Sequence, residues 1–139
     1  MSKVLVPVDG SENALRAVRY AVALAKDKPG YEFHLLHVVD PSEFIDDNYW
    51  KPNAIERLTQ DGQTKLNAAK KLFDEAGVPC ESELVVGNAR NDIAAHARSK
   101  GCDAIIMGTR GMSPMAAMFI GSVAQRVLHT ADVPVTLVK

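Results

Sequence analysis

Residues 103–122 read D-A-I-I-M-G-T-R-G-M-S-P-M-A-A-M-F-I-G-S, and three signals in this stretch decide the fold. The apolar run Asp103–Met107 predicts a buried strand. Gly108 and Gly111 follow it, and two glycines at a strand end allow a sharp turn with no Cβ in the way of a ligand. The pair Gly121-Ser122 then opens a helix-like run whose first amide groups can face an anion. A strand, a glycine turn and a helix start in this order are typical of an α/β fold with a phosphate site.

Short β-branched runs alternate with longer helical patterns along the rest of the chain. The predicted strands are Lys3–Val8, Glu32–Val39, Glu81–Val86, Asp103–Met107 and Val133–Val138. The predicted helices are Glu12–Lys26, Asn53–Ala76, Ala89–Ser99 and Ser122–Thr130, with a loop over Asp40–Pro52. This alternation predicts one doubly wound α/β domain over residues 1–139. Its five-stranded parallel sheet has the order 3-2-1-4-5, with helices on both faces.

Helical spacing predicts which side chains of the first two helices face the sheet. In the first helix, with Ser11 as its N-cap, they are Leu15, Val18, Val22 and Ala25. In the second, which Gly77 and Pro79 terminate, they are Ile55, Leu58, Leu66, Ala69 and Leu72.

The predicted strand order also predicts where a ligand binds. In such sheets ligands bind at the carboxyl ends of strands 1 and 4, where the two strands diverge. Strand 1 ends in P-V-D-G-S at residues 7–11, and strand 4 ends in G-T-R-G at residues 108–111. The full spacing G-x2-G-x9-G-S between a strand and a helix favours nucleotide binding over glycines that serve only as turn residues.

The chain resembles the universal stress proteins, specifically their ATP-binding branch. The resemblance is carried by V-P-V-D-G-S after strand 1, L-L-H-V-V-D at strand 2, M-G-T-R-G at strand 4, G-S-V-A at the last helix and the closing V-P-V-T-L-V. It implies that Asp9 contacts ribose and phosphate, that Val38 contacts adenine through its backbone, and that the glycine motif holds phosphates. The nucleotide-binding residues expected on this basis are Pro7, Val8, Asp9, Val38, Met107, Gly108, Arg110, Gly111, Gly121, Ser122 and Val123.

Charge in the phosphate loop is sparse. Residues 112–120 contain no Lys or Arg, whereas many members of the resembled family place one there. Neutralising the phosphates of ATP, ADP or AMP is then left to backbone amides, to Arg110 and to a divalent cation such as Mg²⁺ or Mn²⁺.

No set of catalytic residues is evident. His34 and His37 lie an odd number of positions apart on a strand and so face opposite sides, His96 is expected on the surface, and His129 is expected to interact with a helix dipole. The leading hypothesis is a cytosolic adenine-nucleotide-binding stress regulator in which nucleotide orders residues 109–120 for an unknown protein partner. The alternatives are a slow metal-dependent ATPase or self-phosphorylating enzyme, and a dimeric interaction module that binds no nucleotide.

Composition limits the other classes. The net charge of −1 gives no reason to expect nucleic acid, and no apolar run approaches the roughly 20 residues of a membrane span. The N-terminus leads straight into a strand pattern, which predicts a cytoplasmic protein with no signal peptide. Cys80 and Cys102 lack metal-ligand spacing; reduced, buried thiols are expected, although the sequence leaves a disulfide between them open.

The last predicted strand, Val133–Val138, is expected at an edge of the sheet. It has no charge until Lys139, and Pro134 fits an edge position because proline has no N–H to donate. An unprotected apolar edge predicts a homodimer that pairs this strand with its copy across a two-fold axis. The resemblance implies the same interface.

Overall fold

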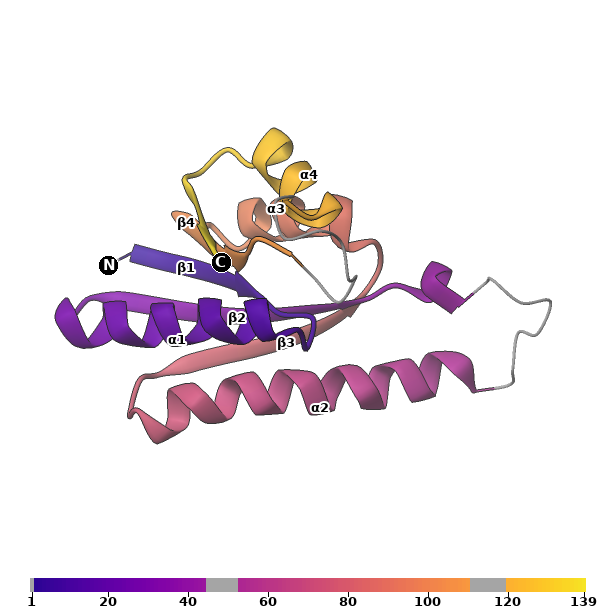
Figure 1. The fold of residues 1–139 in the computed structure, drawn as a ribbon, viewed down its shortest axis with the longest axis horizontal. Helices are drawn as coiled ribbons and strands as arrows, with labels where there is room; N and C mark the ends of the chain where they lie inside the picture. Colours follow the sequence, from indigo (N-terminus) through magenta and orange to yellow (C-terminus); the bar gives the residue numbers. More distant parts are fainter. Residues whose placement is uncertain (1, 45–52, 111–119) are drawn as a thin grey trace.

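The computed structural model describes residues 2–44, 53–110 and 120–139 of the chain, and Figure 1 shows their fold. The strands are β1 (Ser2–Pro7), β2 (Tyr31–Val39), β3 (Cys80–Val86), β4 (Ala104–Gly108) and β5 (Val135–Val138). The helices are α1 (Glu12–Asp27), α2 (Ala54–Glu75), α3 (Ala89–Ser99) and α4 (Ser122–Thr130), and the short 3-10 helix η1 covers Pro41–Phe44.

The five strands form one parallel sheet in the order β3-β2-β1-β4-β5. This confirms the predicted fold class and strand order. The central strand β1 pairs with β2 on one side and with β4 on the other, with Leu5 opposite both His34 and Ile105. Strands β2 and β3 are added on one side of β1, and β4 and β5 on the other, so the carboxyl ends of β1 and β4 lie at the switch point of the sheet.

Two apolar clusters cover the two faces of the sheet. Val4 and Val6 of β1 pack with α1 and α2, whereas Leu5 between them packs with α3 and α4. Side chains alternate between the faces of a strand, so β1 contributes to both clusters and is buried on both sides. Figure 1 shows the same arrangement, with α1 and α2 on one side of the sheet and α3 and α4 on the other.

The N-cap of α1 and the glycine that ends α2 lie where the sequence predicts them. The Oγ of Ser11 accepts a hydrogen bond from the amide of Ala14 at 3.1 Å, which confirms the predicted N-cap of α1. Gly77 follows α2 and Gly101 follows α3 with φ values of +70° and +67°, a conformation that glycine adopts without strain.

The predicted inward faces are partly confirmed. In α1 the buried positions are centred on Ala14, Ala17, Val18 and Ala21, with Leu15, Val22 and Ala25 only partly buried at the margin. In α2 the prediction is wrong for Ile55, whose side chain is exposed. The first turns of α2 extend beyond the strand ends, so no sheet lies beneath them (Figure 1).

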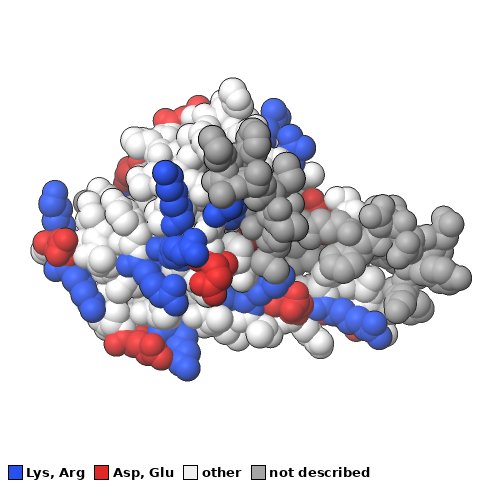
Figure 2. All heavy atoms as spheres, viewed as in Figure 1, with Lys and Arg blue, Asp and Glu red and all other residues white. Residues whose placement is uncertain are grey.

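The surface charges and the cysteines do not point to a particular class of ligand. Figure 2 shows acidic and basic side chains interspersed over the described part of the face in view. None of the described helices is both long enough and apolar enough to cross a bilayer. Both cysteines are free thiols; Cys80 packs with the cluster under α1 and α2, and Cys102 belongs to the cluster on the opposite face.

Candidate functional site

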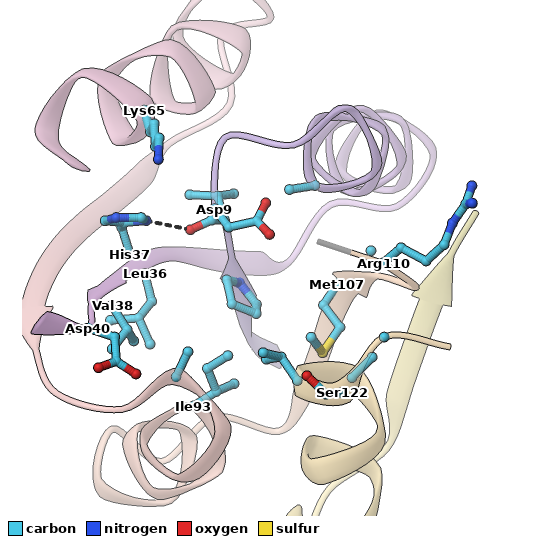
Figure 3. A pocket seen from close by; sticks show the side chains of 18 of the residues that line it. Asp9, Leu36, His37, Val38, Asp40, Lys65, Ile93, Met107, Arg110 and Ser122 are labelled. Carbon is cyan, nitrogen blue, oxygen red and sulfur yellow. Dashed lines mark hydrogen bonds between the residues drawn. The ribbon is translucent and has the colours of Figure 1, made fainter. Parts of the chain in front are cut away.

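A cavity of about 720 Å³ lies at the carboxyl ends of β1, β2 and β4. Its volume falls within the range of about 300–1,000 Å³ that is usual for small-molecule sites. Ten of the eleven residues predicted from the sequence line it: Pro7, Val8, Asp9, Val38, Met107, Gly108, Arg110, Gly121, Ser122 and Val123. The eleventh, Gly111, lies outside the described residues. Helices α2, α3 and α4 complete the walls, as Figure 3 shows.

One wall of the cavity is apolar. It is formed by Leu36 and Val38 of β2, Ile93 of α3 and Met107 of β4 (Figure 3). Asp40 follows β2 directly and brings a carboxylate to the margin of this wall. Such a surface suits a flat ring system with a few polar atoms at its edge.

The end of β1 forms a polar turn beside this wall. The Oδ1 of Asp9 accepts a hydrogen bond from the amide of Ser11 at 2.9 Å, which holds the carboxylate in an Asx turn. Gly10 between them has a φ of +86°. The turn therefore fixes the side chain of Asp9, which is only half-buried, at the cavity rim.

His37 of β2 is a cavity residue that the sequence analysis did not select. Its Nδ1 donates a hydrogen bond to the carbonyl oxygen of Val8 at 2.8 Å, and the side chain is buried (Figure 3). Because a carbonyl oxygen only accepts, Nδ1 carries a proton. Gly62 of α2 packs on the other side of the ring, where an added Cβ would lie 2.6 Å from the Cδ2 of His37.

Lys65 of α2 is a second cavity residue that the sequence analysis missed. Its Nζ lies 3.1 Å from the Oδ2 of Asp61, one helical turn earlier, and both residues line the cavity. The carbon chain of Lys65 packs over the turn of β1, because a Cβ on Gly10 would lie 2.8 Å from its Cδ. Figure 3 shows the ammonium group on the side of the cavity where His37 and Asp9 lie.

The N-terminus of α4 closes the opposite end. The amide of Gly121 donates to the carbonyl oxygen of Thr109 at 2.6 Å, so the two ends of the glycine segment meet. Gly121 is the N-cap and provides no side-chain cap. The amides of Ser122 and Val123 fall in the first helical turn, where no carbonyl group of α4 itself can accept from them. These amides, rather than that of Gly121, are the donors that this helix end offers to a ligand.

Gly108 has a packing role as well as a place in the cavity wall. A Cβ at this position would lie 2.8 Å from the carbonyl carbon of Asn13, in the first turn of α1. Contacts this short to backbone atoms require a shift of the helix or the strand. The glycine that begins the sequence motif therefore permits α1 to pack against the end of β4.

His96 differs from its sequence expectation. The prediction of a surface position was wrong, since only 13% of its side chain is exposed and its Nε2 lies 3.1 Å from the Oε2 of Glu83. The orientation predicted for His34 and His37 is confirmed, because His37 contacts the α1 and α2 side of the sheet and His34 lies on the other.

The fold and the cavity together define a doubly wound α/β protein with a ligand cavity at its topological switch point. The sequence model of the universal stress protein family matches residues 1–139. The chain belongs to this family. Universal stress protein MJ0531 of Methanocaldococcus jannaschii is 36% identical over 140 residues, which cover 99% of this chain and 81% of that protein.

Solved structures of universal stress proteins have the same fold as this chain. The structure of MJ0577, a universal stress protein of the same organism, superposes with a TM-score of 0.86 at 31% identity, covering 99% of this chain and 95% of that one. More distant structures share the fold. One is a universal stress protein in complex with cAMP (TM-score 0.74, 24% identity, 99% and 97% covered). Another is the Arabidopsis thaliana family protein At3g01520 with AMP bound (TM-score 0.68, 20% identity, 100% and 92% covered).

Proposed function

We propose that this chain binds an adenine nucleotide in the cavity and acts as a nucleotide-dependent regulator in the stress response. The observation that carries the proposal is the convergence of ten predicted residues on one cavity at the strand ends. Further support comes from the two distant relatives, which share the fold and whose structures contain AMP or cAMP.

The adenine ring would lie on the apolar wall between Val38 and Ile93. The ribose hydroxyls would face the carboxylate of Asp9, which is already oriented by its turn. The phosphates would lie at the N-terminus of α4, where the amides of Ser122 and Val123 and the helix dipole favour negative charge. A divalent cation such as Mg²⁺ or Mn²⁺ would supply positive charge there, and Arg110, whose guanidinium points away from the cavity in Figure 3, would add to it by turning its side chain inward.

Lys65 lies across the cavity from the N-terminus of α4 (Figure 3), so it would meet the terminal phosphates of a chain that extends from α4 past Asp9 toward α2. Residues 112–120 contain no Lys or Arg, but Lys65 reaches the cavity from α2 and is held by Asp61. A nucleotide phosphate that approaches Lys65 would compete with Asp61 for the same ammonium group. We therefore expect Lys65 to contribute more to binding of ATP or ADP than to binding of adenosine.

Two parts of the hypothesis extend beyond the cavity. Ordering of residues 109–120 by nucleotide concerns mainly residues 111–119, which lie outside the described residues, and it stays a prediction. The same holds for a protein partner that would recognise this surface. A homodimer through β5 is proposed on the position of that strand at the edge of the sheet.

The proposal is tested by identifying the nucleotide carried by the purified protein. Protein freshly purified and then denatured should release an adenine nucleotide that mass spectrometry identifies. Titration calorimetry on nucleotide-free protein should show binding of ATP, ADP or AMP and weaker binding of GTP. Absence of released nucleotide together with no heat of binding at millimolar concentrations would disprove the function.

Two matched pairs of variants assign the contacts. Arg110→Gln should weaken ATP binding, whereas Arg126→Gln, on the exposed face of α4, should not. Lys65→Met should weaken ATP binding but leave adenosine binding unchanged, and Lys71→Met on the outer face of α2 is its control. An unchanged ATP affinity in Lys65→Met would remove Lys65 from the site without affecting the rest of the proposal.

A further inference from the structure

A second cluster of metal-ligating side chains lies away from the nucleotide cavity. It is built on the face of the sheet that α3 covers, near the start of β3. The cluster comprises Glu32 and His34 of β2 and Glu81 of β3. His34 lies directly opposite Glu81 in the β2–β3 register, so both side chains point to the same face.

His34 has a carboxylate beside each of its ring nitrogens. Its Nε2 lies 3.2 Å from the Oε1 of Glu32, and its Nδ1 lies 3.5 Å from the Oε2 of Glu81. One ligand atom from each of the three residues can be chosen so that all lie within 4.8 Å of one another. Only 13% of the His34 side chain is exposed, so its surroundings restrict the imidazole to this position.

A hollow of about 330 Å³ lies beside this cluster. Glu83, His96 and Lys100 form its other side, where the Oε2 of Glu83 lies 3.1 Å from the Nε2 of His96 and 3.4 Å from the Nζ of Lys100. Lys100 therefore neutralises Glu83. Glu32 and Glu81 have no Lys or Arg within ion-pair distance among the described residues, which leaves two carboxylates around one imidazole.

We propose that Glu32, His34 and Glu81 form a binding site for a divalent transition metal of the Zn²⁺ class. In tetrahedral zinc sites, Zn–N and Zn–O distances of about 2.0–2.2 Å place neighbouring ligand atoms about 3.3 Å apart. The 3.2 Å between the Nε2 of His34 and the Oε1 of Glu32 matches this spacing. Glu81 lies at the other ring nitrogen, Nδ1, so its side chain, which is 77% exposed, would have to rotate around the ring edge to bind the same ion at Nε2. Water completes the coordination from the hollow.

The donor set selects the metal class. One imidazole with two carboxylates suits Zn²⁺ and neighbouring first-row ions, whereas Mg²⁺ and Ca²⁺ prefer oxygen ligands only. Two carboxylates and a neutral imidazole also match the charge of a dication. The site is distinct from the nucleotide cavity, because none of its three residues lines that cavity. It is therefore independent of any metal ion that accompanies phosphates.

The test uses ZnCl₂ and the full chain, with nucleotide removed first so that no phosphate-bound metal is counted. Calorimetry in a non-chelating buffer should show one Zn²⁺ per chain, with much weaker binding of Mg²⁺. Zn²⁺ should also raise the melting temperature, because a ligand that binds only the folded state stabilises it. His34→Gln and Glu81→Gln should each reduce the affinity at least tenfold and abolish the thermal shift.

Three control variants define the ligands. His129→Gln removes an exposed histidine elsewhere, and Glu83→Gln and His96→Gln remove the other side of the hollow; all three should retain Zn²⁺ binding within a factor of about two. Glu81→Gln changes an exposed side chain, so it remains informative if His34→Gln fails to fold. Absence of stoichiometric Zn²⁺ binding would overturn the proposal. So would binding that survives both His34→Gln and Glu81→Gln, or that depends on His96.

Discussion

The Nδ1 of His37 donates a hydrogen bond to the carbonyl oxygen of Val8 at 2.8 Å, and this contact joins the ends of β2 and β1 at the candidate nucleotide site. The amide of Val8 donates to the carbonyl oxygen of Leu36 at 2.8 Å, so both backbone groups of Val8 bond to adjacent positions of β2. The next residue along the chain is Asp9. The position of its carboxylate therefore depends on a hydrogen bond from a neighbouring strand.

Replacing His37 tests this dependence. His37→Leu leaves the carbonyl oxygen of Val8 without its buried donor, which costs about 1–3 kcal/mol of stability. We expect nucleotide affinity to fall about tenfold as the turn at Asp9 loosens, a change of about 1.4 kcal/mol. His37→Asn is the matched control, since its amide nitrogen takes a position close to Nδ1 and restores most of both losses. Denaturant melts and calorimetry measure the two effects, and equal behaviour of Leu and Asn would contradict the argument.

Gly108→Ala should affect folding more than binding. The added Cβ would lie 2.8 Å from the backbone of Asn13, a contact that requires α1 or β4 to shift. Overpacking of this kind typically costs about 1–3 kcal/mol. Chemical denaturation should show this loss even with no nucleotide present. A variant as stable as the parent protein would show that the end of β4 is not tightly packed on α1.

Gly121→Val should affect nucleotide binding more than folding. Gly121 has a φ of −62° and a ψ of 160°, which valine adopts without strain, so the fold should survive with a loss of about 1 kcal/mol for a poorer N-cap. The branched side chain would crowd phosphates at the first turn of α4, and we expect ATP binding to be lost. Calorimetry on the folded variant decides the matter, and unchanged affinity would exclude phosphate binding beside Gly121.

The difference between the predicted and the missed cavity residues has a physical origin. Asp9 and Gly108 were predictable because parallel strands place their carboxyl ends at one edge, whatever the helices do, whereas Val38 was indicated only by the family resemblance. Lys65 and Asp61 could not be found in this way. They lie mid-helix, and they reach the cavity only because α2 extends past the strand ends, which no local pattern in the sequence encodes. The exposure of Ile55 has the same cause.

His37 was missed for a different reason. In a sequence, histidines indicate a site when they can form a metal-binding or catalytic set, and His37 belongs to neither. Its contact with Val8 spans 29 positions of the chain and depends on the β1–β2 register. The close approach of Gly62 was a usable signal, because a glycine in the middle of a helix destabilises it unless packing requires one.

Cys80 should react slowly in the folded protein. Burial raises the pKa of its thiol to about 12, and only part of this rise is offset by a backbone hydrogen bond with Leu35 and by the charge of Lys70. The reactive species is the thiolate, so almost none is present at pH 8. Iodoacetamide at this pH should label the unfolded chain quickly and the native chain slowly, as mass spectrometry can follow. Rapid labelling of native Cys80 would mean that β3 opens readily at the sheet edge.

The same pKa difference predicts how stability depends on pH. Because the pKa of Cys80 is raised on folding, the free energy of unfolding should be constant at neutral pH and fall once pH exceeds the pKa of the unfolded thiol, near 9.

The last prediction concerns dimer formation through β5. The carbonyl oxygens of Pro134 and Val138 point inward and accept hydrogen bonds from the amides of Ile105 in β4 and of Thr109 just after β4, both at 2.9 Å. In a parallel ladder the alternate residues then direct their backbone groups outward, which leaves Val135 and Leu137 to pair with another chain. The structure differs from the sequence prediction in one respect, since β5 begins at Val135 rather than Val133. Pro134 therefore lies just outside the strand and does not protect its edge.

Thr136 is the residue at which to test this interface. Its side chain is exposed, whereas Val135 and Leu137 pack in the cluster with α3 and α4. Light scattering should give twice the chain mass of 15.1 kDa for the parent protein. Thr136→Glu would place two like charges near the two-fold axis, where each unfavourable cross-strand pair costs up to about 1 kcal/mol. The equilibrium between monomer and dimer should shift toward monomer, and less so at high salt because the repulsion is screened.

Thr136→Val is the matched control for this interface. Valine is β-branched and neutral, so this variant should remain a dimer. A parent protein that is monomeric at high micromolar concentration, or a Thr136→Glu variant with unchanged dimer affinity at low salt, would rule out this interface.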